Sequence, residues 1–330
     1  MTTFKEIRGT AIRSVSSDPT NPEVGQIWYN NTIGVLKGYK SLGATWASGG
    51  TTSTSSNAGG GAGVQTSALV FGGRGPDVAF VSTAEEYNGS TWTAGGSLST
   101  ARAYIAGFGT QTDAVCAGGR TNPGGTTTDA TEEYNGSAWT GGGNMGTGRR
   151  VGGSAGLTGS AGLAFGGASP PSTATEEYDG SAWTAGGSMN TGRGYAAGFG
   201  IQTSAVAASG TPYSAATEEY NGSSWTSVNN MNTARQQAAA SGSSETAGIV
   251  FGGETPPATL SAATESYNGT NWTTSPASLA TARLGLMGAG QSSSSALAMQ
   301  GAIGPPGPAW GGLTEEWTDP VFAVQKITTS

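Results

Sequence analysis

Short apolar runs, separated by stretches rich in Gly, Ser and Thr, recur along most of the chain. Runs such as 68–71, 163–165 and 249–251 end in Gly-Gly. Each is followed, after a loop, by Thr-Glu-Glu-Tyr or a close variant. Short apolar runs bounded by Gly-rich turn segments are typical of β strands, so the pattern predicts an all-β protein built from many short strands.

A longer phrase, Glu-Glu-Tyr-Asn-Gly-Ser-x-Trp or a close variant, occurs five times, and a decayed sixth copy ends at Trp317. Its tyrosines lie 42 to 47 residues apart, a period that fits the blades of a β-propeller. The tyrosines are Tyr87, Tyr134, Tyr178, Tyr220 and Tyr267.

Each repeat divides into four predicted strands. The first follows Thr-Ala-Arg or Thr-Gly-Arg, the second is the apolar run into Gly-Gly, the third is Thr-Glu-Glu-Tyr and the fourth is Ser-x-Trp-Thr. Ser56 stands at the arginine position of the first repeat. The arginines of the other repeats are Arg102, Arg149, Arg193, Arg235 and Arg283.

Asn-Gly between the third and fourth strands predicts a type I′ turn. With a two-residue turn, Tyr87 faces Ser90 and Glu85 faces Trp92 across the hairpin. Glu85, Tyr87 and Trp92 then share one face of the sheet, and Glu86 lies on the other.

The first glutamate of each pair is predicted to be partly buried, and a buried carboxylate needs a donor. The repeat arginine is the obvious partner, so we expect structural ion pairs rather than catalytic carboxylates. Adjacent strand residues point to opposite faces, which does not suit acid–base work by a Glu-Glu pair. The first-position glutamates are Glu85, Glu132, Glu176, Glu218, Glu265 and Glu315.

The count of strands predicts how the ring closes. A tryptophan marks the fourth strand six times, beginning at Trp46, which precedes the first complete repeat. The last third strand, at Trp317, has no Trp-bearing strand after it. We therefore expect the strand around Trp46 to pair with the strand around Glu315–Trp317 and to complete a sixth blade.

The order Arg, Gly-Gly, Tyr and Trp over four strands resembles the kelch repeat from about residue 44 to residue 318. Departures are Ser56 for Arg, and Ala-Ser-Gly at 208–210 and Met-Gln-Gly at 299–301 for Phe-Gly-Gly. The resemblance implies a six-bladed kelch-like β-propeller over residues 41–320. An N-terminal arm over 1–40 and a C-terminal tail over 321–330 flank it. Glu-Glu before Tyr resembles a variant in virion proteins of bacteriophages and cyanophages.

Residues 18–30 of the arm are similar to a Gly-Gln-Ile-Trp-Tyr-Asn element near the starts of phage tail and tail-fibre proteins. Residues 26–30 and 35–39 are predicted to form a hairpin. Ile27, Trp28 and Tyr29 are candidates for docking onto other virion proteins. The alternative is a hairpin that only packs on the propeller.

Composition excludes several functions. Gly contributes 58 residues and charged residues only 11%, which suits strands and turns. A net charge of −7 with 14 scattered Lys and Arg argues against nucleic acid as a partner. No histidine is present, which removes the commonest general base and transition-metal ligand, and with them the copper-oxidase chemistry of some kelch-like propellers. We expect no enzyme activity, cofactor or metal. Cys116 is expected to be a buried packing residue, and neither a membrane-spanning run nor a secretory signal is apparent.

The loops between the second and third strands differ in every repeat, and three carry an aromatic residue. Trp310, Tyr213 and Phe80 are therefore candidate ligand-binding residues, because binding residues concentrate on variable loops of rigid scaffolds. The alternatives are neutral variation of exposed loops and, for Trp310, a role in capping the last blade.

These patterns together favour a non-enzymatic phage virion protein, localised to the tail and present in several copies per particle. Its arm would bind other virion proteins, and its propeller would face a host-surface glycan or protein, or another virion protein. The alternative is a free or cell-surface glycan-binding propeller, a lectin or adhesin. An enzyme on this fold ranks last. Fold alone does not decide among these functions, because propellers carry many of them.

Overall fold

The computed structural model describes residues 12–22, 25–41, 43–150, 152–168, 170–304, 310–319 and 322–327. Every regular element in these ranges is a β strand, which confirms the predicted all-β class. No helix in this part of the chain is long and apolar enough to cross a membrane. The chain divides into two compact units: Met1–Ala44 joined by Asp319–Ser330, and Thr45–Thr318.

Within the described residues, the unit Thr45–Thr318 holds six four-stranded antiparallel sheets and one two-stranded hairpin. Five sheets follow one another along the chain: β5 (Gly60–Val64), β6 (Ser67–Phe71), β7 (Ala84–Tyr87), β8 (Trp92–Ala94); β9 (Ala106–Gly109), β10 (Ala114–Ala117), β11 (Thr131–Tyr134), β12 (Trp139–Gly141); β13 (Gly153–Thr158), β14 (Ala161–Phe165), β15 (Thr175–Tyr178), β16 (Trp183–Ala185); β17 (Ala197–Ile201), β18 (Ser204–Ala208), β19 (Thr217–Tyr220), β20 (Trp225–Val228); and β21 (Ala239–Ser244), β22 (Ala247–Phe251), β25 (Thr264–Tyr267), β26 (Trp272–Thr274). The hairpin of β23 (Glu254–Thr255) and β24 (Thr259–Leu260) lies in the loop after β22.

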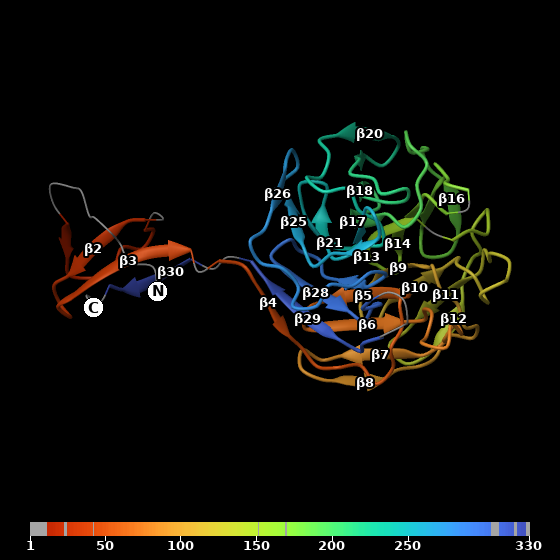
Figure 1. Ribbon diagram of the computed structural model, residues 1–330, viewed down its shortest axis with the longest axis horizontal. Helices are drawn as coiled ribbons and strands as arrows, with labels where there is room; N and C mark the ends of the chain where they lie inside the picture. The colour runs from red at the N-terminus through yellow and green to blue at the C-terminus, as the bar shows by residue number, and fades with distance from the viewer. Residues whose placement is uncertain are drawn as a thin grey trace. The chain divides into compact units, whose positions relative to one another are not determined.

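The remaining sheet combines both ends of the unit, in the order β27 (Met287–Ala289), β28 (Ser295–Met299), β29 (Thr314–Thr318) and β4 (Thr45–Ser48). Trp46 lies directly opposite Trp317, and their ring centroids are 5.3 Å apart. The predicted pairing of these two strands is therefore confirmed. The six sheets lie about a common centre, a propeller-like architecture (Figure 1).

The first strands of the sheets lie closest to this centre, and their small residues allow that approach. A Cβ on Gly198 would lie 2.3 Å from the carbonyl oxygen of Ser154, and one on Gly288 would lie 2.4 Å from that of Ala240. Real Cβ atoms do not approach so closely, so these positions exclude larger residues. The high glycine content thus reflects neighbouring backbones in contact, as well as turns.

The hairpin between the third and fourth strands differs from the predicted two-residue turn. Tyr87 pairs with Trp92, and Glu85 with Ala94, so four residues form the loop. Asn88 accepts hydrogen bonds at Oδ1 from the backbone N–H groups of Ser90 and Thr91, and only Gly89 in this loop has a positive φ. The register moves by two residues, an even number, so Tyr87 and Trp92 still share one face.

The smaller unit is a four-stranded sheet in the order β1 (Arg13–Val15), β2 (Ile27–Asn30), β3 (Val35–Ser41) and β30 (Phe322–Lys326). The predicted hairpin of the arm is β2 with β3, and β1 lies parallel to β2. The segment predicted as a C-terminal tail, 321–330, contains β30, which pairs with β3 from Ser41–Phe322 to Lys37–Lys326. The two chain ends therefore build one unit, and the chain connects it to the sheets twice.

Asp18 organises the smaller unit. Its carboxylate accepts hydrogen bonds from the Trp28 indole at 3.1 Å and the Asn30 amide at 2.9 Å, and it pairs with Lys37 at 2.6 Å. These donors, led by Lys37, lower the pKa of Asp18 to about 2.

Candidate functional site

Four recurring contacts account for the repeated residues of the sheets, and they are structural. The first joins each repeat arginine to the first-position glutamate of its own sheet. Arg149 lies 3.2 Å from Glu176, and Arg235 lies 2.5 Å from Glu265. The other pairs are Arg102–Glu132, Arg193–Glu218 and Arg283–Glu315, and all ten side chains are buried.

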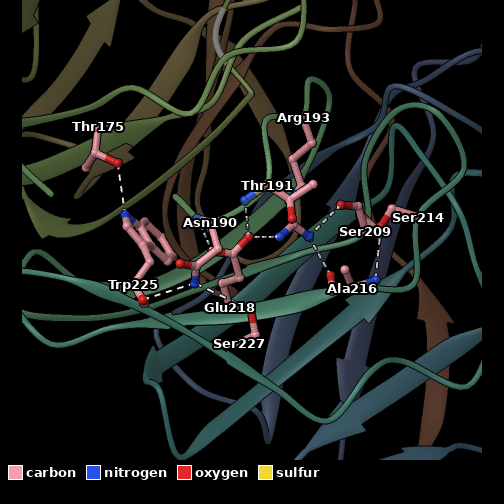
Figure 2. A network of polar contacts seen from close by, with 10 residues as sticks. All are labelled: Thr175, Asn190, Thr191, Arg193, Ser209, Ser214, Ala216, Glu218, Trp225 and Ser227. Carbon is pink, nitrogen blue, oxygen red and sulfur yellow. Dashed lines mark hydrogen bonds and ion pairs between the residues drawn. The ribbon is translucent and has the colours of Figure 1, made fainter. Parts of the chain in front are cut away.

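Figure 2 shows one of these pairs with its surroundings. Arg193 also donates to the backbone carbonyl of Ala216 at 2.6 Å, and the backbone N–H of Asn190 donates to Glu218 at 2.7 Å. Both charges therefore have hydrogen-bond partners besides each other, which favours a buried ion pair, although the Arg193 Nε–H has none among the described residues. The Glu218 carboxylate thus bonds to groups of its own sheet.

The first sheet has no arginine, and other donors replace it. Glu85 accepts hydrogen bonds from the backbone N–H groups of Ser53 and Thr54 and from the Thr54 hydroxyl, at 2.6–2.9 Å. Ser56 occupies the arginine position and donates to Gln300 Oε1 at 2.6 Å.

The second recurring contact joins neighbouring sheets through the second glutamate. The Tyr134 hydroxyl donates to Glu86 at 2.6 Å, and the Tyr87 hydroxyl donates to Glu316 at 2.6 Å. The same contact joins Tyr178 to Glu133, Tyr220 to Glu177 and Tyr267 to Glu219.

This contact explains why the fifth repeat has Ser266 instead of a second glutamate. The following sheet has Trp317 in place of tyrosine, and the Trp317 indole donates to the Ser293 carbonyl instead, at 3.0 Å. The glutamate acceptor is therefore absent from the one repeat whose following sheet has no tyrosine hydroxyl to donate.

The third contact joins the fourth-strand tryptophan to a threonine at the start of a third strand in the preceding sheet. The Trp183 indole donates to the Thr131 hydroxyl at 2.9 Å, and four other tryptophans donate to the equivalent threonine of the sheet that precedes theirs. Ala84 stands where the other third strands begin with threonine. Among the described residues, the buried Trp139 indole N–H accordingly has no hydrogen-bond partner.

The fourth contact is a cross-strand ring pair within each hairpin. Tyr267 and Trp272, for example, have ring centroids 4.8 Å apart, and the other hairpins repeat this arrangement at 4.8–5.0 Å. Such pairs stabilise a sheet beyond the area that they bury. The side chains of the repeated motif are thus engaged in contacts within and between the sheets. A ligand site is therefore expected among residues that vary between repeats.

A variable position lies two residues after the repeat arginine, just before the innermost strand. Its residues have left-handed backbones, with φ of 54° at Ala58, 61° at Tyr104, 52° at Tyr195, 54° at Gln237 and 60° at Gly285. A left-handed backbone at a bulky residue costs about 1–3 kcal/mol and persists only where the surroundings impose it. We call these five residues the central mouth, because they line one cavity of about 160 Å³.

Backbone hydrogen bonds connect the central mouth from sheet to sheet. In each bond a backbone N–H donates to a backbone carbonyl: Tyr104 to Ala58 at 2.6 Å, Ala58 to Gly285 at 2.7 Å, Gly285 to Gln237 at 2.9 Å and Gln237 to Tyr195 at 3.1 Å. These bonds join the left-handed residues of successive sheets through their backbones.

Aromatic and cationic side chains gather at the central mouth. The rings of Tyr104 and Tyr195 have centroids 5.6 Å apart. Arg150 lies at the rim, with its guanidinium 5.5 Å from the Tyr104 ring and its Nη1 donating to the Tyr195 hydroxyl at 3.1 Å. These residues are not among the candidates predicted from sequence, which came from the longer loops, although the position two residues after the repeat arginine varies visibly between repeats.

The structure brings two of the three candidate loop residues together. Phe80 packs edge-on against Tyr104 at 6.2 Å and forms a β-bridge with Arg74, whose guanidinium lies 6.0 Å from the Trp310 ring. Phe80 and Trp310 are both half-buried beside Arg74. Tyr213 belongs to another sector, where its hydroxyl donates to Glu254 at 3.1 Å.

The three candidate docking residues of the arm differ in how far their side chains are buried. Trp28 is fully buried and its indole donates to Asp18, so its side chain packs within the smaller unit. Ile27 is half-buried, whereas Tyr29 is 41% exposed. Ile12 and Ile33 of the same unit are also exposed, at 42% and 55%.

Cys116 is fully buried on β10, and burial raises the pKa of its thiol to about 12, so the thiolate is not available at neutral pH. Among the described residues, no three His, Cys, Asp or Glu side chains gather as metal ligands would. No protein-family model matches the chain, and comparison with curated proteins finds no match.

Proposed function

We propose that this chain is a non-enzymatic binding protein of a phage virion, carried on the tail, with a closed six-bladed kelch-like propeller as its scaffold. One observation carries the binding role. The residues that recur in every repeat are used up in internal contacts, whereas the residues that vary gather at the central mouth and its loops. A rigid frame with a variable face is typical of binding proteins.

Contacts between successive sheets support a closed ring of six. The N–H of the last glycine after each second strand donates to the carbonyl at the repeat arginine position of the next sheet. This bond recurs from Gly73–Arg102 to Gly253–Arg283, and Gly301 to Ser56 returns to the first sheet, all at 2.8–2.9 Å. The hydroxyl of Tyr87 on Glu316 and the indole of Trp92 on Thr314 span the same junction.

The use of the Glu-Glu pairs supports a role without catalysis. In the second sheet, Glu132 binds Arg102 inside the sheet, while Glu133 accepts from Tyr178 of the next sheet. Two carboxylates with separate structural partners are not arranged as an acid and a base around one substrate.

The smaller unit suits attachment. Tyr29, Ile12 and Ile33 expose apolar surface on it, and exposed apolar side chains of this size mark interaction sites when they gather. The placement in a virion rests on the resemblance of the arm and of the Glu-Glu-Tyr phrase to phage proteins. Several copies per particle would follow from a tail location.

Mass spectrometry of gradient-purified particles tests the virion assignment. The chain should be present at a constant ratio to the major tail proteins, and antibodies against it should label tails in micrographs. Removal of residues 1–41 together with 322–330 should abolish incorporation while the sheets stay folded. Presence of the chain only in the culture medium or on cells would contradict the assignment.

The free or cell-surface lectin remains the second candidate, because the paired tyrosines and arginine at the central mouth suit a sugar wherever the protein resides. The particle experiment separates the two candidates, since the lectin would bind glycans without being part of a virion.

A further inference from the structure

The central mouth has three properties of a binding site that its structural role does not require. Bulky residues occupy left-handed positions at Tyr104, Tyr195 and Gln237, although Gly285 meets the same backbone demand without strain. Backbone strain that the local structure does not need is concentrated at functional sites.

The second property is the cavity itself. At about 160 Å³ it is smaller than the roughly 300–1,000 Å³ of pockets for drug-sized ligands, so it suits a single small ring. Two tyrosine rings line it, and apolar C–H faces of sugars pack on such rings.

The third property is an unneutralised positive charge at the rim. Among the described residues, no carboxylate lies within ion-pair distance of Arg150, although five other arginines are paired with glutamates. Arg150 is held by the Tyr195 hydroxyl and the Tyr104 ring instead. A positioned guanidinium binds a carboxylate through two parallel hydrogen bonds.

Polar groups for orientation complete the mouth. The Gln237 side-chain amide has no hydrogen-bond partner among the described residues, so its donor and acceptor are available to hydroxyl groups. Glu254, the carboxylate in the neighbouring sector, is already bonded to Tyr213 and Gln236.

We propose that the central mouth binds one carboxylate-bearing sugar ring, a uronic or sialic acid, of a surface glycan. This deepens the proposed binding role and rests on it. The ring packs on Tyr104 and Tyr195, its carboxylate pairs with Arg150, and its hydroxyls bond to Gln237.

Calorimetric titration of the purified full chain tests the proposal with three probes: methyl β-glucuronide, N-acetylneuraminic acid and the neutral methyl β-glucoside. At least one acidic sugar should bind, and the neutral sugar should bind about tenfold more weakly or not at all. Binding of the glucuronide alone or of N-acetylneuraminic acid alone identifies the source of the carboxylate. Failure of both acidic sugars to bind overturns the proposal.

Three variants locate the site. Arg150→Gln should remove the preference for acidic over neutral sugar, and Tyr104→Gly should lower affinity about tenfold or more while changing the melting temperature by no more than about 4 °C. Ile201→Ala, on the same type of innermost strand but beyond the end that lines this cavity, should bind as the native chain does. Unchanged binding by both mouth variants overturns the proposal. The virion assignment has its own readout in purified particles, so either idea can fail alone.

Discussion

The interior of the sheets and the central mouth use the same repeated chain in opposite ways. In the interior, the same residue types pair in sheet after sheet, such as Arg193 with Glu218. At the mouth, equivalent positions hold Ala58, Tyr104 and Gln237, which share only a left-handed backbone. Residues that repeat in this chain therefore build the scaffold, and a binding site is expected where the backbone conformation repeats but the side chain does not.

The largest expected effect comes from breaking an interior ion pair. Arg193→Ala leaves Glu218 buried without its guanidinium, which should lower the free energy of unfolding by about 3–5 kcal/mol. Denaturant titration measures this. Arg120→Ala is the matched control, because Arg120 is half-buried and binds the loop carbonyl of Gly125, so its loss should cost less than about 1 kcal/mol. Equal effects of the two variants would remove the distinction between interior and surface arginines.

A smaller effect is expected where neighbouring sheets meet. Tyr178→Phe removes the hydroxyl that binds Glu133, and loss of a hydrogen bond to a charged group should cost about 1.5–3 kcal/mol. Ser266→Ala is the control, because Ser266 occupies the second-glutamate position opposite a sheet with no tyrosine hydroxyl. It should change stability by less than about 0.5 kcal/mol.

The same tyrosines predict a loss of stability in alkali. Burial first, and then the bond to glutamate, raises the pKa of Tyr87, Tyr134 and Tyr220 from 10.0 to about 12. Because the folded-state pKa lies above the unfolded one, this stabilisation is complete below pH 10 and is lost as the pH rises through about 12. Unfolding free energies measured between these pH values should fall, and Tyr134→Phe should fall less steeply. Identical slopes for variant and native chain would contradict the account.

One substitution should stabilise the protein. Ala84→Thr supplies the hydroxyl that five other tryptophans find at this position, so the buried Trp139 indole gains an acceptor and stability should rise by about 1 kcal/mol. In a Trp139→Phe background the same substitution should give no gain. A gain that persists there would mean that threonine acts through strand propensity alone.

The smallest stability effect is expected at the mouth. Tyr104→Gly relieves a left-handed backbone but loses the ring contacts with Tyr195 and Phe80, so the two terms should nearly cancel, to within about 1 kcal/mol. Thermal unfolding measures the balance. A loss of unfolding free energy comparable to that of Arg193→Ala would mean that Tyr104 is part of the structural scaffold.

Sequence alone predicted the four-strand repeat, the Arg–Glu partners and the pairing of the Trp46 and Trp317 strands, because each depends on period and strand count. It missed the hairpin register, since Asn88 closes a four-residue loop with its side chain, a contact that the Asn-Gly signature does not encode. It also missed the pairing of β30 with β3, which joins residues nearly 300 positions apart with no repeated motif. The central mouth could not be predicted from the sequence, because its residues share a backbone conformation but no residue type.

A crystal structure of the full chain grown with the acidic sugar that binds in calorimetry would show whether the central mouth is the sugar site. We expect a sugar ring against Tyr104 and Tyr195, with its carboxylate within about 3 Å of the Arg150 guanidinium. A ligand bound elsewhere, for example beside Tyr213 or on the smaller unit, with the central mouth empty, would contradict it.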